Sequence, residues 1–96
     1  MATEPSGDYQ SDLPVPPGEL LAEEIDARGM TRRQFAAALG LSPQSVGELL
    51  RGRRGVTAET ALELERVLGV SAVFWLRLEA SYRLALARQR RQARSA

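Results

Sequence analysis

The sequence contains no cysteine, no histidine and no lysine. Without cysteine or histidine, the chain lacks thiolate nucleophiles, imidazole bases, disulfides and the ligands of most zinc and transition-metal sites. Its carboxylates do not cluster with the loop spacing of an oxygen-ligand metal site. We therefore expect a protein that is not an enzyme and that uses no cofactor or metal.

Long apolar runs are also missing. No segment approaches the roughly 20 apolar residues that span a bilayer, and residues 1–12 have neither a basic residue nor the apolar centre of a signal peptide. The absence of cysteine fits a reducing compartment. We expect a cytoplasmic protein with no membrane partner.

Charge is segregated along the chain, although the net charge is only +1. Residues 1–30 carry seven acids and one arginine, whereas residues 31–57 carry five arginines and one acid. Residues 58–80 are again net acidic, and residues 81–96 carry five arginines and no acid. Two basic blocks indicate local anion-binding surfaces better than the net charge does. The exclusive use of arginine has two explanations, namely coding bias of the source genome or the bidentate contacts that arginine makes with phosphate and guanine.

The residues that typically begin and end helices predict an all-α domain of five helices. Ser, Thr or Pro stands at each predicted start, and Gly at each of the first four ends. We expect an acidic, disordered segment at 1–16, a helical domain at 17–88 and a basic tail at 89–96. The predicted helices lie between Pro17 and Gly29, Thr31 and Gly40, Ser42 and Gly52, Thr57 and Gly69, and from Ser71 to about Arg91.

The stretch 31–50 predicts a helix-turn-helix. Its two short helices are joined by only Gly40, Leu41 and Ser42, and so tight a turn makes them cross steeply. The small side chain of Ala36 allows close approach, and Gly40 provides the backbone freedom that ends the first helix. An apolar wedge between the two helices is expected from Leu39, Leu41, Val46 and Leu49.

Three stretches carry a family resemblance: the opening PPGELLAEEIDARGM, the central LLRGRRGVTAETAL and the ending FWLRLEASY. Over about Pro17 to Tyr82 the chain resembles the lambda-repressor-like (XRE) helix-turn-helix family, and within it the HigA/VapI antitoxin group. The resemblance implies a five-helix lambda-repressor-like DNA-binding domain with a long C-terminal helix and a recognition helix at about 43–51. In related repressors the position of Pro43 often carries a base-reading Gln, which is absent here.

Three side chains of the predicted recognition helix are candidates for reading bases in the major groove. Gln44 can bind adenine N6 and N7 in a bidentate manner, and Ser45 can donate or accept a hydrogen bond. Glu48, one turn beyond Gln44, can accept from cytosine N4. The alternative is that Gln44 and Glu48 are ordinary solvated residues.

Residues on either side of the motif are candidates for binding DNA phosphates. The resemblance implies a phosphate contact for Arg32, at the positive end of a helix. Gln34 is a weaker candidate because the capping box also uses it. The arginines that follow the recognition helix are phosphate clamps or, alternatively, a solvated basic loop. The full set is Arg32, Arg33, Gln34, Arg51, Arg53 and Arg54.

The last predicted helix is apolar on two sides and therefore has two surfaces to bury. We expect the first stripe to face the core of its own domain and the second to form the interface of a homodimer. Partial exposure of the second stripe is the alternative. The first stripe is Phe74, Trp75, Leu78, Tyr82 and Leu86; the second is Val73, Leu76, Ala80, Leu84 and Ala87.

Three functions follow from these patterns. The first is an antitoxin that represses its own operon as a dimer on double-stranded operator DNA; for it the resemblance implies a cognate toxin of the HigB/RelE-like, mRNA-cleaving kind. The second is a stand-alone repressor without a toxin. The third is a helical protein-interaction module that does not bind DNA.

Overall fold

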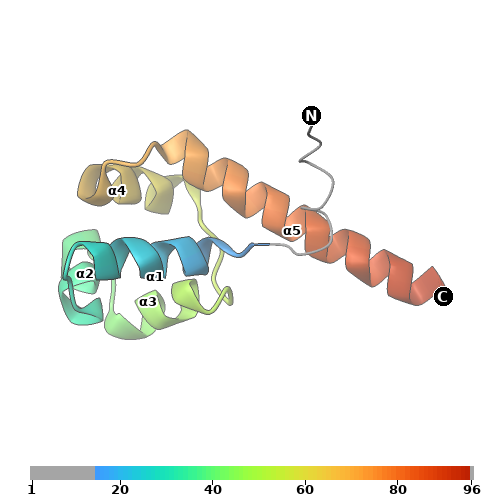
Figure 1. Ribbon diagram of the computed structural model, residues 1–96, viewed down its shortest axis with the longest axis horizontal. Coiled ribbons are helices and arrows are strands. Elements are labelled where there is room, and N and C mark those ends of the chain that lie inside the picture. Colours follow the sequence, from blue (N-terminus) through green and yellow to red (C-terminus); the bar gives the residue numbers. More distant parts are fainter. Residues whose placement is uncertain (1–14, 96) are drawn as a thin grey trace, which may run out of the picture.

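The computed structural model describes residues 15–95, which form five helices and no strand. Helices α1 to α4 gather into a head, and α5 crosses it and projects beyond it (Figure 1). The all-α class expected from the sequence is confirmed. The disorder predicted for the N-terminus falls almost entirely outside the described residues. The helices are α1 (Pro17–Ala27), α2 (Arg32–Leu39), α3 (Pro43–Leu50), α4 (Ala58–Leu68) and α5 (Ala72–Ser95).

Side-chain caps begin the helices of the motif where the sequence predicts them. Thr31 Oγ1 accepts from the Gln34 N–H at 3.0 Å, and Gln34 Oε1 accepts from the Thr31 N–H at 2.8 Å, which completes the capping box of α2. Ser42 Oγ accepts from the Ser45 N–H at 3.1 Å and caps α3. Thr57 caps α4 in the same way. These bonds satisfy N–H groups that have no partner inside the helices.

The turn between α2 and α3 is set by one glycine. Gly40 has a φ of 75°, in the left-handed region that favours glycine. The Leu41 N–H donates to the Ala36 carbonyl at 2.9 Å, and the Gly40 N–H donates to the Ala37 carbonyl at 3.2 Å. This pair of bonds closes the helix as a Schellman motif and turns the chain directly into α3. The turn thereby fixes the direction in which the tip of α3 points.

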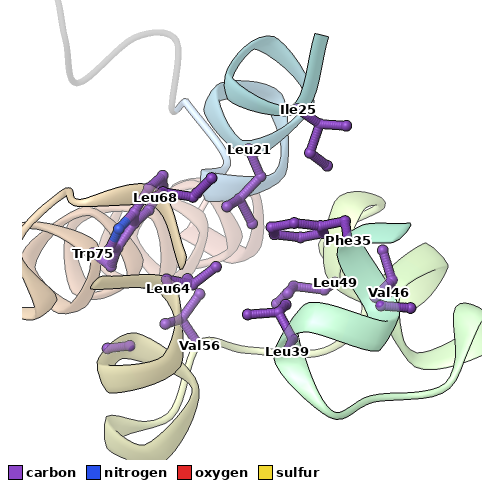
Figure 2. Close-up of a cluster of buried hydrophobic side chains, with 12 residues drawn as sticks. Leu21, Ile25, Phe35, Leu39, Val46, Leu49, Val56, Leu64, Leu68 and Trp75 are labelled. Carbon is purple, nitrogen blue, oxygen red and sulfur yellow. The ribbon is translucent and has the colours of Figure 1, made fainter. Parts of the chain in front are cut away.

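A single apolar core holds the head together, with contributions from all five helices and from the loop before α4. Figure 2 shows the ring of Phe35 pointing from α2 toward Leu21 of α1. The predicted wedge is confirmed, since Leu39, Val46 and Leu49 are buried and Leu41 is partly buried. The core residues are Leu21, Ile25, Phe35, Ala36, Leu39, Val46, Leu49, Val56, Ala61, Leu64, Leu68 and Trp75.

Helix α1 packs against the end of α3 with no space between the two backbones. A Cβ atom on Gly18 would lie 2.1 Å from the carbonyl oxygen of Leu50. Only glycine permits this approach, because no side-chain rotation can remove a clash between Cβ and backbone. Gly18 therefore determines how closely α1 packs against α3.

Helix α5 begins in the core and leaves it. Ser71 Oγ accepts from the Val73 N–H at 3.1 Å, and Trp75 is fully buried. Phe74, expected in the core, is instead 42% exposed. Successive helical residues diverge by roughly 100°, so Trp75 takes the core direction and Phe74 turns to solvent. The helix runs to Ser95, beyond the expected end near Arg91.

Residues 89–95, which belong to the expected basic tail, form the helical end of α5. No residue between 76 and 94 is fully buried within the chain. Within residues 15–95, no helix combines the length and the apolar character needed to cross a membrane.

Candidate nucleic-acid interface

The tip of α3 presents polar side chains to solvent. Gln44 is exposed, as the base-reading prediction requires, and Ser45 is half-buried. The Ser45 hydroxyl accepts from Ser42 Oγ at 3.1 Å and keeps its own proton available for a partner outside the chain. Glu48 is half-buried one turn further along. The tip can thus donate and accept hydrogen bonds, which is what the edges of bases offer.

The polar face of α3 ends on an arginine. Gln44, Glu48 and Arg51 are spaced four and three residues apart and share one side of the helix, opposite the buried Val46. Both terminal nitrogens of Arg51 lie 3.3 Å from the position that a Cβ atom on Gly47 would occupy. The guanidinium therefore lies beside Gly47, where a larger residue would displace it.

We call residues 51–55, which follow α3, the arginine loop. Arg51, Arg53 and Arg54 are all exposed there. Gly52 has a φ of 76°, and the Arg53 N–H donates to the Glu48 carbonyl at 2.9 Å, so a second Schellman motif ends α3. The loop thus carries its positive charges directly beside the candidate recognition helix.

Arg54 lies on the α4 side of the arginine loop. It lines a pocket of about 260 Å³ between the turn of the motif and the start of α4. Two carboxylates, Glu59 and Glu63, line the same pocket. Arg51 and Arg53 do not line this pocket, which makes them the stronger phosphate candidates of the loop.

The start of α2 provides the second cationic region. Arg32 and Arg33 are exposed in its first turn, where the helix dipole adds positive potential. Gln34 is also exposed, but its Oε1 atom is used in the capping box. Its amide NH₂ group is the part that can donate to a phosphate oxygen. The phosphate-binding roles of these three residues stay predictions.

Two other arginines serve the fold. Arg28 Nη2 donates to the Leu68 carbonyl at 2.5 Å and also pairs with Glu24. Arg66 Nη2 donates to the Ala38 carbonyl at 2.6 Å. Each guanidinium thereby satisfies a carbonyl in the last turn of a neighbouring helix, where a positive charge interacts favourably with the helix dipole.

The sequence analysis missed a contact between α5 and the arginine loop. Arg83 Nη2 donates to the Gly52 carbonyl at 3.0 Å, and Arg83 Nε donates to Glu79 Oε2 at 2.6 Å. The spacing of Glu79 and Arg83 was visible as a helical i, i+4 pair. Its attachment to Gly52, 31 residues away, was not, because no local pattern specifies it.

The residues predicted for the dimer interface are not all exposed to solvent. Val73 is 54% exposed and Leu84 is 50% exposed, and Ala80 is also exposed. Leu76 is half-buried because it packs partly against the core of its own chain. Ala87 is half-buried as well. The most exposed apolar side chains of the predicted interface are therefore Val73 and Leu84.

These features together define a helix-turn-helix domain: two short helices, a glycine turn, an exposed polar tip and flanking arginines. Within residues 15–95, no group of three or more acidic side chains is placed to hold a metal ion. The arrangement is suited to binding an anionic polymer through its backbone and its polar edges.

Comparisons with known proteins agree with this class. Residues 21–75 match the helix-turn-helix family model. The chain is 38% identical to virulence-associated protein I of Dichelobacter nodosus, over 88% of this chain and 80% of that protein. The chain therefore belongs to the XRE-type helix-turn-helix family, in which its relatives include HigA antitoxins.

Solved structures give the same result. An addiction-module antidote protein of the HigA family from Coxiella burnetii has a TM-score of 0.77 and 35% identity, covering 84% of this chain and 89% of that one. The antitoxin HigA of Pseudomonas aeruginosa, solved with the higBA promoter, also has a TM-score of 0.77, at 33% identity and the same coverage. At these identities the likeness extends beyond the fold to the family.

Proposed function

We propose that the protein is a DNA-binding antitoxin that represses its own operon and neutralises a RelE-like, mRNA-cleaving toxin. The observation that carries the proposal is the exposed tip of α3 with arginines beside it. Support comes from the similar Pseudomonas aeruginosa antitoxin, which was solved with promoter DNA. We infer that this activity takes place in the cytoplasm, because the operator DNA would lie there.

On DNA, α3 lies in the major groove with its N-terminal turn toward the bases. Gln44 pairs with an adenine, and Ser45 and Glu48 contact neighbouring base edges. The cations at the start of α2 and in the arginine loop bind phosphates on either side of the groove. Phosphate contacts set the affinity and the register, whereas base contacts set the sequence.

The DNA-binding species is a homodimer formed through α5. The exposed side chains of Val73, Ala80 and Leu84 lie along one side of that helix and would be covered by the same face of a second chain. A two-fold dimer presents two recognition helices to half-sites about 34 Å apart. The operator is then an inverted repeat with a spacing of about one helical turn.

For the toxin we propose electrostatic complementarity with the acidic N-terminal region. Residues 1–16 include Glu4, Asp8 and Asp12 and contain no basic residue. An RNA-cleaving enzyme needs a basic surface for its substrate, and an acidic segment can cover that surface. A chain that lacks residues 1–16 should retain less toxin in co-purification. Undiminished retention would remove this segment from the mechanism.

The test of DNA binding is a gel-shift titration with the DNA upstream of the gene, repeated over a series of salt concentrations. If about four arginines per subunit contact phosphate, the slope of log affinity against log salt should be near −7. A flat response, or no binding, would favour a protein-interaction module. DNA binding without any co-purifying toxin would favour a stand-alone repressor.

Two substitutions separate the roles of the side chains. Arg53→Ala should weaken binding to all DNA sequences about equally, because a phosphate contact carries no sequence information. Gln44→Ala should cost about 1–3 kcal/mol on the operator and nothing on unrelated DNA. The opposite pattern would show that the assigned roles are wrong.

A further inference from the structure

The arginine loop carries charges that must be held in place, yet its backbone can adopt many conformations. It contains two glycines, Gly52 and Gly55, in five residues. Glycine has the largest range of backbone conformations, so such a loop loses much entropy when it is fixed. Something outside the loop must hold Arg51, Arg53 and Arg54 in position if they bind phosphates together.

Helix α5, from a distant part of the sequence, contacts the arginine loop. Arg83 donates from Nη2 to the Gly52 carbonyl at 3.0 Å and from Nε to Glu79 Oε2 at 2.6 Å. The Glu79 side chain is only 14% exposed and that of Arg83 is 41% exposed. The carboxylate is thus held between the helix and the loop, and it orients the guanidinium toward the loop backbone.

Both glycines of the loop lie against α5. A Cβ atom on Gly55 would lie 2.9 Å from Glu79 Oε2, and one on Gly52 would lie 3.4 Å from the Tyr82 hydroxyl oxygen. A side chain at Gly55 would therefore displace the Glu79 carboxylate. The contact surface includes Glu79, Tyr82 and Arg83, which follow one another along one side of α5.

We propose that Glu79 and Arg83 form a clamp that positions the arginine loop for DNA, and that the pair determines DNA affinity without reading any base. This inference rests on the proposed DNA-binding function and deepens it. Arg83 is paired with Glu79, so it acts through the loop backbone and is not one more free cation. Both are positioning residues, and α5 thereby joins the dimer surface to the DNA surface.

Glu79 allows a test in which charge and position predict opposite results. By charge alone, removing an acid beside the arginine loop should strengthen binding to anionic DNA. If Glu79 holds Arg83 on the loop, Glu79→Ala should weaken binding by about tenfold, since a charge-assisted hydrogen bond is lost. The matched control is Glu65→Ala, which removes an equal charge from an exposed position on α4.

Arg83→Lys provides a second variant with unchanged charge. Lysine cannot bridge the Gly52 carbonyl and Glu79 with the planar fork that arginine uses, so affinity should also fall several-fold. Equal affinity of wild type and Arg83→Lys would show that only the charge at this position matters. The melting of each variant, followed by the fluorescence of the buried Trp75, reports whether the head is folded.

Limited trypsin digestion of the free protein tests the clamp without DNA. Cleavage after Arg51, Arg53 and Arg54, identified by mass spectrometry, should be several-fold faster in Glu79→Ala and Arg83→Lys than in wild type and Glu65→Ala. Unchanged cleavage, or tighter DNA binding by Glu79→Ala, would overturn the clamp. Failure of the wild-type chain to bind upstream DNA would instead refute the proposed function, whatever the digestion shows.

Discussion

The head of the molecule and outer α5, by which we mean residues 84–95, are stabilised in different ways. In the head, twelve apolar residues are buried against one another, and backbone approaches as close as that at Gly18 leave no freedom. Beyond Trp75, by contrast, no residue up to 94 is fully buried, and Leu84 is half exposed. The head is stabilised by contacts within one chain, whereas outer α5 has no comparable core around it.

Local preference accounts for the helical form of outer α5. Residues 83–94 consist only of Arg, Ala, Leu and Gln, all of which favour helix. Helices of this length are marginal in water without packing, so continuity with the anchored first turns contributes as well. A helix can therefore project from the head, as Figure 1 shows, without a core of its own.

The largest expected effect comes from breaking the head at its tightest point. Gly18→Ala should lower the free energy of unfolding by about 3 kcal/mol, because the added methyl group separates α1 from α3. Urea denaturation followed by Trp75 fluorescence measures this change. Gly40→Ala is the control for backbone strain without a clash, since a Cβ there meets nothing within 4 Å. It should lower the free energy of unfolding by about 1–2 kcal/mol. Equal effects of the two would show that the α1–α3 approach is not tight.

The next effect should appear in assembly and leave the fold intact. Leu84→Glu places a charge in the proposed dimer interface, where it would be buried without a partner. We expect sedimentation to show a monomer, and operator affinity to fall by about tenfold or more. Leu62→Glu is the matched control, since Leu62 is similarly exposed on α4. A dimer that survives Leu84→Glu would place the interface elsewhere.

A proline in outer α5 should separate the two regions directly. Gln89→Pro, made in the Leu84→Glu background to remove effects of assembly, should unfold the end of α5 at a local cost of about 3 kcal/mol. Helical circular dichroism should fall, while the Trp75 unfolding midpoint stays the same. Gln89→Ala controls for the loss of the side chain. A lower Trp75 midpoint would mean that the head depends on outer α5.

The smallest effect concerns α3. Gly47→Ala should stabilise the protein by about 0.5 kcal/mol. Alanine is the better helix former by about 1 kcal/mol, but moving the Arg51 guanidinium aside costs part of that gain. Because Arg51 is displaced and not removed, DNA binding should weaken by only about two- to three-fold, less than the loss of a whole charged contact would cost. Thermal melting and gel shift measure the two changes. Lower stability would show that Arg51 cannot move aside.

Much of the local structure could be predicted from the sequence because its causes are local. The capping box of Thr31 and Gln34, the Ser42 cap and the Gly40 turn depend on neighbouring residues only, and all three are confirmed. Which of two adjacent aromatic residues enters the core is not local. Phe74 and Trp75 would exchange roles if α5 were rotated by roughly 100°, and the packing of α5 against α4 decides which of them is buried.

The arginines of the candidate site and of its surroundings show the same division between local and long-range causes. That Arg51 and Arg53 are exposed beside α3 follows from their place after a capped helix. That Arg28 and Arg66 serve carbonyls of other helices follows from contacts over 40 and 28 residues. Sequence spacing does not predict such contacts, because they form only when the helices pack together.

By itself, the sequence determined five helices, the side-chain caps of α2, α3 and α4, the glycine-hinged motif and the polar tip of α3, since each depends on residues within about one helical turn. Only the tertiary structure decided that α1 meets α3 at Gly18, that Trp75 takes the core and that Arg83 holds the arginine loop. The physical reason is distance along the chain, because a hydrogen bond between Arg83 and Gly52 exists only after the core has brought α5 beside the loop.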